Sequence, residues 1–243
     1  FANYSLHYVG GVPPGGVSAD YYGRFAKLIQ ERLGGGEEFV AAMSNGTSGD
    51  INNINFTNPW PRRKPFEQQQ IVADYVATAV LAAHGSVNFR QWVPIGMMTK
   101  ELSVKNRRVS PERLRQAHEF LAAPDDQKLP PRAKAYAQWA VELNERPPAE
   151  NIIVQAIRLG ELGITTIPCE VFVEIGLALR QRSPFKTHFT VELANGHYGY
   201  LPTPEQHRLG GYETWLGTCR LDEHASVQIS DELVGMLKQL NAR

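Results

Sequence analysis

Apolar residues recur every three or four positions in several stretches of the chain, which is the spacing of helices with one buried face. In residues 65–83, for example, Val72, Tyr75, Val76, Ala79 and Val80 keep this spacing. The pattern predicts helices over residues 18–33, 65–83, 110–121, 132–144, 171–181 and 230–240.

Capping residues set several of these boundaries. Ser18 and Ser230 are plausible N-caps, and Ser110 followed by Pro-Glu is a strong helix start. The glycines at 34 and 85 are stop signals. We therefore expect the last helix to begin at Ser230.

Other stretches alternate apolar and polar residues or are rich in β-branched residues, as strands are. These stretches are residues 4–10, 38–43, 92–104, 152–158, 162–167 and 187–194. The fourth and fifth are joined by a short turn containing glycine, the pattern of a hairpin. A hairpin argues against an all-parallel sheet, so the predicted fold class is α/β (α+β), a mixed β-sheet core with helices packed on it. The helices at about residues 110–145 would form an insertion or lid beside that sheet.

Composition limits the classes of partner. The 243 residues suffice for one sizeable core, and Lys plus Arg number 25, as do Asp plus Glu. This balance gives no net field that favours nucleic acid or an anionic membrane, so neither is expected as a partner. No apolar run reaches the 18 or so residues of a transmembrane segment. Because the chain starts at Phe1 within a predicted strand, we expect a processed or truncated piece.

The two cysteines leave the redox state open. Cys169 and Cys219 could form a disulfide, or they could be two buried thiols of a reducing compartment.

Residues 164–212 hold the candidate chemistry. A strand is predicted to run into a helix near Pro168, with Glu170 in the first helical turn, where a carboxylate would face the positive end of the helix dipole. The next strand leads to His197, Tyr198 and Tyr200 in a loop rich in glycine and proline. Side chains on such a loop can converge on a ligand.

These segments resemble the neutral/alkaline (non-lysosomal) ceramidase family. Pro-Cys-Glu-Val-Phe at 168–172 is similar to the family's Pro-Gly-Glu-Phe segment, whose glutamate binds zinc. Asn-Gly-His-Tyr-Gly-Tyr-Leu-Pro-Thr-Pro-Glu at 195–205 is similar to its Asn-x-Tyr-x-x-Tyr-x-x-Thr-x-Glu run. The resemblance implies that Glu170 and Tyr200 are metal ligands and that Tyr212 contacts the reacting centre.

The resemblance extends to the N-terminal segment. Asn-Tyr-Ser-Leu-His-Tyr-Val-Gly at 3–10 is similar to the family's Asn-Trp-Phe-Ala-Val-His-Gly-Thr, whose histidine binds zinc. In a strand, Ser5, His7 and Val9 would share one face, and a lone histidine there could equally be structural. With Glu170 and Tyr200, His7 completes three ligands for Zn²⁺ and leaves room for water. The family's further histidine belongs to an earlier segment that this sequence does not contain.

The loop at residues 45–53 departs from the family pattern. Phe-Val-Ala-Ala at 39–42 and Gly49-Asp50 match, but Asn52 stands where the family has its catalytic serine. Asparagine cannot act as an alcohol nucleophile, although its amide could position a water or an oxyanion. Thr47 and Ser48 are the nearest hydroxyls. A tight surface turn is the alternative interpretation of this loop.

The implied function is zinc-dependent hydrolysis of an amide, ceramidase-like, on an N-acyl sphingoid lipid or a related amide. The expected catalytic residues are Tyr212, Asn52 and Asp50, with His197 contacting substrate. The chain would be the later part, residues 1–243, of one ceramidase-like catalytic domain, and the family suggests a secreted or periplasmic protein. Two alternatives remain: a metal-dependent hydrolase of a non-lipid amide or ester, and a non-catalytic ligand-binding descendant. The oligomeric state is open.

Overall fold

The centre of the molecule is a four-stranded mixed sheet. The structure, a computed structural model, describes residues 1–59, 63–124 and 127–242. The strands lie in the order β3 (Ile95–Lys105), β4 (Ala149–Leu159), β5 (Leu162–Ile167) and β7 (Thr187–Glu192). The first three are antiparallel, with the predicted hairpin between β4 and β5, and β7 joins β5 in parallel. The α/β class with a mixed sheet is confirmed.

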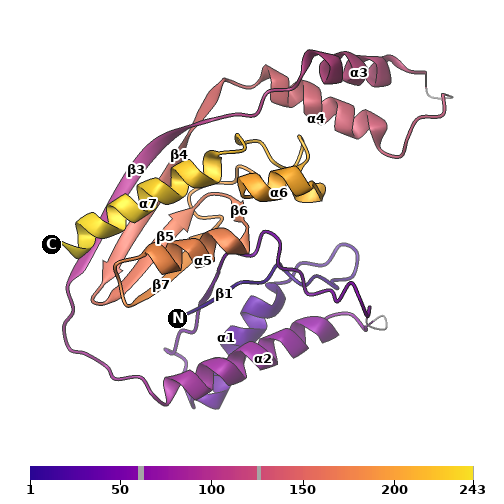
Figure 1. Ribbon diagram of the computed structural model, residues 1–243. Coiled ribbons are helices and arrows are strands. Elements are labelled where there is room, and N and C mark those ends of the chain that lie inside the picture. Colours follow the sequence, from indigo (N-terminus) through magenta and orange to yellow (C-terminus); the bar gives the residue numbers. More distant parts are fainter. Residues whose placement is uncertain (60–62, 125–126, 243) are drawn as a thin grey trace.

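Two helices cover one face of this sheet (Figure 1). They are α5 (Val173–Arg182), which packs against β7, and α7 (Ala225–Asn241), which packs against β3 and β4. In β4 the even-numbered Ile152 and Val154 are fully buried in the main core, whereas Ile153 is exposed. The alternation follows from the strand period of two and leaves the opposite face of the sheet open to solvent at this strand.

The N-terminal part forms a second layer with its own core. Helices α1 (Asp20–Arg32) and α2 (Glu67–His84) pack together and bury residues such as Tyr21, Phe25 and Val76. Strands β1 (Ala2–Tyr4) and β2 (Met43–Asn45) pair in parallel beside them. The Asn3 amide donates to the Thr190 carbonyl (3.1 Å), which ties this layer to β7.

The helical pair α3 (Pro111–Ala122) and α4 (Ala133–Glu145) projects beyond the end of β3 and β4 (Figure 1). Its helices pack on each other around a third small core. The Ser110 hydroxyl accepts from the Arg113 amide, as its N-cap position predicts. The pair is held to the rest of the molecule where the Trp139 ring packs directly against Gly217.

The remaining short elements surround the candidate site. β6 (Glu170–Val171) pairs in parallel with β8 (Tyr200–Leu201), and α6 (Pro204–Leu209) and the 3-10 helix η1 (Tyr212–Thr214) follow. Two-residue strands carry too little periodic signal to be recognised in a sequence.

The predicted strand over residues 4–10 is wrong beyond Tyr4. The Tyr4 carbonyl accepts from Gly46, and the His7 amide donates to the Ile51 carbonyl, so this segment is held by the 45–51 loop instead of a ladder. Leu6 is buried and Tyr8 is 72% exposed, although the prediction placed them on the same face. The segment is irregular, and strand alternation does not decide where His7 points.

The predicted position of Glu170 in a helix is also wrong. Glu170 donates its amide to the Gly199 carbonyl, and Phe172 donates to Leu201, so residues 170–172 remain extended alongside β8. Helix α5 begins at Val173, where the Asp50 carboxylate accepts the first amide (2.9 Å). The carboxylate of Glu170 is therefore explained by its side-chain contacts, not by a helix dipole.

Ser230 does not cap the last helix. It lies inside α7, which begins five residues earlier, at Ala225, after a turn closed by the Asp222 carbonyl. Ser230 is buried within this helix, and a serine in a helix interior gives the same signal in the sequence as an N-cap. The second predicted strand is displaced as well, since β2 begins at Met43, where pairing with β1 becomes possible.

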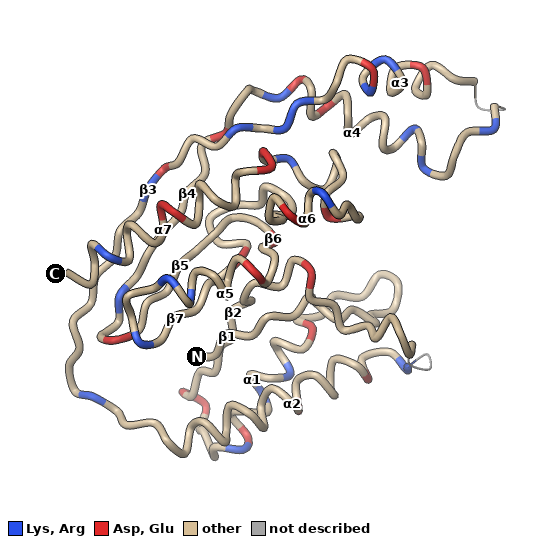
Figure 2. The backbone as a smooth tube through the Cα atoms, in the orientation of Figure 1, with Lys and Arg blue, Asp and Glu red and all other residues tan. Residues whose placement is uncertain are grey.

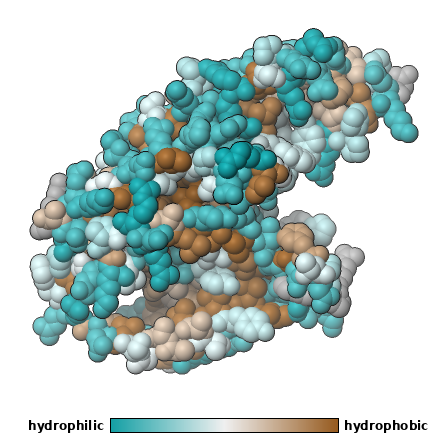
Figure 3. Space-filling view, viewed as in Figure 1, coloured by the Kyte–Doolittle hydropathy of each residue, from teal (hydrophilic) through white to brown (hydrophobic). Residues whose placement is uncertain are grey.

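Both cysteines, Cys169 and Cys219, are buried free thiols, and Cys169 belongs to the main core. No helix in the described ranges combines the length and apolar character needed to cross a bilayer. Acidic and basic residues are interspersed along the same helices and strands (Figure 2). Figure 3 shows apolar residues gathering in the recessed middle of one face, above α2.

Candidate metal centre

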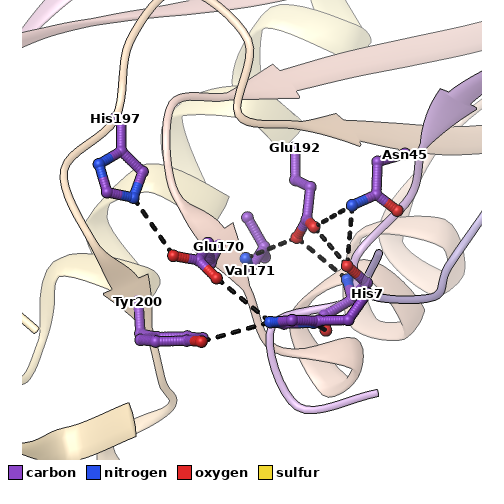
Figure 4. A network of polar contacts seen from close by, with 8 residues as sticks. His7, Asn45, Glu170, Val171, Glu192, His197 and Tyr200 are labelled. Atoms are coloured by element: carbon purple, nitrogen blue, oxygen red, sulfur yellow. Dashed lines mark hydrogen bonds and ion pairs between the residues drawn. The ribbon is translucent and has the colours of Figure 1, made fainter. Parts of the chain in front are cut away.

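Three side chains from distant parts of the sequence meet where β6, β8 and the N-terminal segment adjoin. Register between β6 and β8 sets Glu170 opposite Tyr200. His7 reaches the same point because its amide is bound to the Ile51 carbonyl in the adjacent loop. Figure 4 shows the three side chains pointing toward one another.

The donor atoms are close together. His7 Nε2 lies 3.3 Å from Glu170 Oε2 and 3.3 Å from the Tyr200 hydroxyl. The His7 and Tyr200 rings are stacked, with an interplanar angle of 8°. One nitrogen and two oxygens therefore surround a single point.

The second ring nitrogen of His7 determines what this point can hold. Nδ1 lies within hydrogen-bond distance of the Ser48 carbonyl, which can only accept, so Nδ1 carries a proton. Nε2, which faces the Glu170 carboxylate, then carries either a lone pair or a second proton. A lone pair at Nε2 can accept from the Tyr200 hydroxyl but is repelled by the Glu170 carboxylate, so the carboxylate favours a positive charge at Nε2, either a proton or a metal ion.

The donor set fits zinc. Imidazole, carboxylate and phenol are ligand types that zinc accepts, and two ligands roughly 2.0–2.1 Å from a tetrahedral zinc lie about 3.3 Å apart. That separation equals the two distances from His7 Nε2. The Ser48 carbonyl supplies the outer contact that commonly orients a metal-binding histidine.

The third donor has to be a phenol. Within residues 1–59, 63–124 and 127–242, no three His, Cys, Asp or Glu side chains form a group that could hold a metal ion by themselves. His197 is near, but its Nε2 lies 3.2 Å from Oε1 of Glu170, the oxygen on the other side of the carboxylate from His7. His197 is thus placed to hold Glu170, in addition to lining the pocket.

His7 and Glu170 carry the charge at the site, and each shifts the pKa of the other. The hydrogen bond to Glu170 raises the pKa of His7 against the opposing effect of burial. Burial favours a higher pKa for Glu170, but hydrogen bonds from His7, His197 and Tyr200 outweigh it and lower the pKa. Burial, followed by the negative charge of Glu170, raises the pKa of Tyr200, so its phenol keeps its proton unless a cation is bound.

Sequence reasoning missed Glu192, the buried carboxylate at the end of β7. It is 4% exposed and accepts from the Ser48 amide (3.0 Å), the Ser48 hydroxyl, the Asn45 amide group (2.6 Å) and the Val171 amide (2.8 Å). Burial raises its pKa to about 7 against these hydrogen bonds. Figure 4 shows it joining Asn45, on the loop whose Ser48 carbonyl contacts His7, to Val171, which follows Glu170. The only sequence signal was an acidic residue on the face of β7 shared with His188 and Thr190.

A pocket of about 320 Å³ opens over the three donors. Tyr212 lies on its wall, with its ring edge-on to Tyr200 at 6.0 Å between centroids. Trp139 of the helical pair lines the same pocket, which the sequence did not indicate. The pocket thus combines polar donors with aromatic rings in its lining.

Asp50 and Asn52 are placed differently. Neither is among the described residues that line this pocket. Asp50 caps the first amide of α5, a positioning contact, and burial raises its pKa. Asn52 is exposed and follows Ile51, whose carbonyl binds the His7 amide. The loop at 45–53 therefore supports the donor cluster and is more than a surface turn.

The nearby hydroxyls are engaged or enclosed. Ser48 is fully buried, and its hydroxyl bonds to Glu192. Thr47 is 6% exposed and packs against Gly176 of α5. Neither hydroxyl lines the pocket described above.

Comparison with known proteins gives a fold but no close relative. No family model matches the sequence, and no curated protein matches it. Among solved structures, neutral ceramidase from Pseudomonas aeruginosa superposes with a TM-score of 0.70 at 14% identity, over 98% of this chain and 44% of that one. A ceramidase complexed with C2 gives a TM-score of 0.65 at 13% identity, over 93% and 43%.

The chain spans less than half the length of both ceramidase chains. The match covers nearly all of this chain, and the prediction of a partial ceramidase-like domain is confirmed at the level of fold. The chain therefore has the fold of part of a neutral ceramidase.

Proposed function

We propose that the chain forms a zinc-dependent centre for the hydrolysis of amide bonds, with His7, Glu170 and Tyr200 as the zinc ligands. The observation that carries the proposal is the convergence of these three donors, two of them at 3.3 Å from His7 Nε2, at the base of an open pocket. The ceramidase-like fold supports it independently.

Each residue of the site has a part in this proposal. Bound zinc would polarise a substrate carbonyl and make a water molecule acidic enough to attack near neutral pH. The Ser48 carbonyl keeps Nε2 of His7 directed at the site, and His197 holds the outer oxygen of Glu170. The Tyr212 hydroxyl, on the pocket wall, donates to the oxygen of the carbonyl as negative charge develops there.

The attacking group in this proposal is water, not a side chain. Asn52 has no hydroxyl, and the hydroxyl of Ser48 is committed to Glu192 inside the core. Asn52 itself is exposed and is not among the described residues that line the pocket, so its loop acts on the site through the Ile51 carbonyl that binds the His7 backbone. Hydrolysis then runs without an acyl-enzyme.

The test is a panel of N-acyl amides that includes an N-acyl sphingoid lipid, assayed with zinc and after chelation. We expect turnover that chelation removes and that zinc restores, with no burst of amine in rapid mixing. Mass spectrometry should find no acyl group on Ser48 or Thr47, and finding one would contradict attack by water.

The same panel separates the alternatives. Turnover confined to small amides or esters would favour the non-lipid hydrolase. Zinc bound at one per chain with no turnover on any member would favour a ligand-binding descendant, for which the replacement of the serine by Asn52 is the supporting observation.

A further inference from the structure

Arg220 is held on the wall of the pocket that contains the three donors. Its carbonyl accepts from the Arg107 amide, and the preceding residue, Cys219, bridges to Gly199. Its side chain is half-buried and donates through Nη2 to the His197 carbonyl (3.2 Å) and to His197 Nδ1 (3.4 Å). The backbone on both sides is fixed, so the guanidinium is presented to the pocket in a defined place.

This guanidinium has no carboxylate partner. In the part of the chain that the structure describes, no Asp or Glu lies within ion-pair distance of Arg220. Arg146, which shares a neighbouring pocket with it, is paired with Glu150 at 2.9 Å. A guanidinium has five N–H donors, and the His197 contacts use only one of its nitrogens. The remaining donors can hold an oxyanion in bidentate geometry.

Arg220 also lies close to the proposed reaction centre. His197 stands between them, with Nε2 on Glu170 and Nδ1 facing Arg220. An anion on Arg220 is therefore one imidazole ring away from a metal ligand. The rings of Trp139 and Tyr212 line the same pocket and offer an apolar surface to the body of a small ligand.

Resting on the proposed amide hydrolysis, we infer that the pocket selects amides that carry an anionic oxygen group, a carboxylate or a phosphate, beside the scissile bond, and that Arg220 binds this group. In an N-acyl amino acid, the carboxylate is separated from the amide nitrogen by one carbon atom, which suits this short span. Water adds across the C–N bond, so the products are a carboxylic acid and an amine that keeps the anionic group.

The test compares two ligands that differ in charge alone. N-Acetylphenylalanine carries a carboxylate, and N-acetylphenylalaninamide replaces it by a neutral amide of the same shape. Calorimetric titration of the zinc-free and the zinc-loaded protein should give at least about tenfold tighter binding of the carboxylate, the range of a hydrogen-bonded ion pair. Inorganic phosphate as a competitor shows whether phosphate or carboxylate is preferred.

Substitutions of Arg220 test whether this residue causes the preference for the carboxylate ligand. Arg220→Gln should remove the preference for the carboxylate, whereas Arg146→Gln, the matched arginine that already has a partner, should keep it. Arg220→Lys keeps the positive charge but loses the paired N–H donors of the guanidinium, so its preference for the carboxylate should be reduced. This variant covers the case in which Arg220→Gln does not fold. Equal affinity of the wild type for both ligands would overturn the inference, as would an unchanged preference in the Arg220 variants.

The two proposals can fail separately. A charge preference without turnover of N-acetylphenylalanine or any other amide would leave the anion site intact and remove the hydrolase. Turnover of amides without a charge preference would keep the hydrolase and remove the role of Arg220, leaving it as a residue that orients His197.

Discussion

Replacement of Glu192 tests how the donor cluster is supported. In Glu192→Gln, the amide oxygen can still accept from the Ser48 and Val171 amides. The new NH₂ group then faces the Asn45 amide nitrogen, which lies 2.6 Å from the present oxygen. Two donors cannot satisfy each other. If the Asn45 amide turns over, its Oδ1, which has no hydrogen-bond partner among the described residues, accepts from the new group, but its Nδ2 is then buried without a partner. Either way a buried donor loses its partner at a cost of about 1–3 kcal/mol. Chemical denaturation at pH 6 measures this loss.

A second substitution should reverse the mismatch. Asn45→Asp turns the donor that faces the new NH₂ group into an acceptor, and the Ser48 hydroxyl can rotate to donate to the introduced carboxylate. The double variant should recover about 0.5–3 kcal/mol relative to the sum of the single changes. A loss below about 0.5 kcal/mol in Glu192→Gln, or strictly additive effects, would refute the reasoning.

The pH dependence provides an independent check. Burial raises the pKa of Glu192 from 4.5 to about 7 in the folded protein. A raised pKa contributes stability that is fully present below pH 4.5 and lost as the pH rises through 7. The advantage of the wild type over Glu192→Gln should therefore shrink across this window. An advantage that grows with pH would show that the carboxylate, not the acid, is the favoured buried form.

Two further changes probe the pocket walls. Gly217→Ala should destabilise the protein by roughly 1–3 kcal/mol, because the added Cβ would overlap the Trp139 ring. The control is Gly235→Ala in α7, which should be neutral or stabilising because an added Cβ would meet no atom of the described residues within 4 Å. Equal melting temperatures for the two variants would contradict the packing argument. Tyr212→Phe should lower kcat roughly 100-fold with zinc content unchanged, and wild-type turnover would remove Tyr212 from the mechanism.

Periodic elements were predictable because long segments repeat their burial pattern. The 18-residue helix α2 and the β4–β5 hairpin follow from spacing and turn residues. Glu170 shows where this fails, because Pro-Cys-Glu-Val-Phe suits a helix start locally and stays extended only through its partner β8. The helix-cap signal at Ser230 fails similarly, since a serine can be buried inside a helix.

The candidate site needed information beyond spacing. His7, Glu170 and Tyr200 are separated by at least 30 positions in the sequence, so their convergence was an expectation from family resemblance alone. Glu192 and Arg220 carry no motif, and their importance comes from what surrounds them in space. Long-range contacts of single polar residues leave almost no periodic trace, which is why sequence reasoning missed them.

Zinc binding by the chain tests the central claim most directly. A crystal grown with zinc should show one anomalous peak roughly 2.0–2.2 Å from His7 Nε2, a Glu170 carboxylate oxygen and the Tyr200 hydroxyl. In solution, affinity measured against a competing chelator should weaken as the pH falls, because Glu170 raises the pKa of His7 and a proton then competes for Nε2. His7→Ala should lose most of this affinity. Zinc located elsewhere, or bound equally well by His7→Ala, would contradict the assignment.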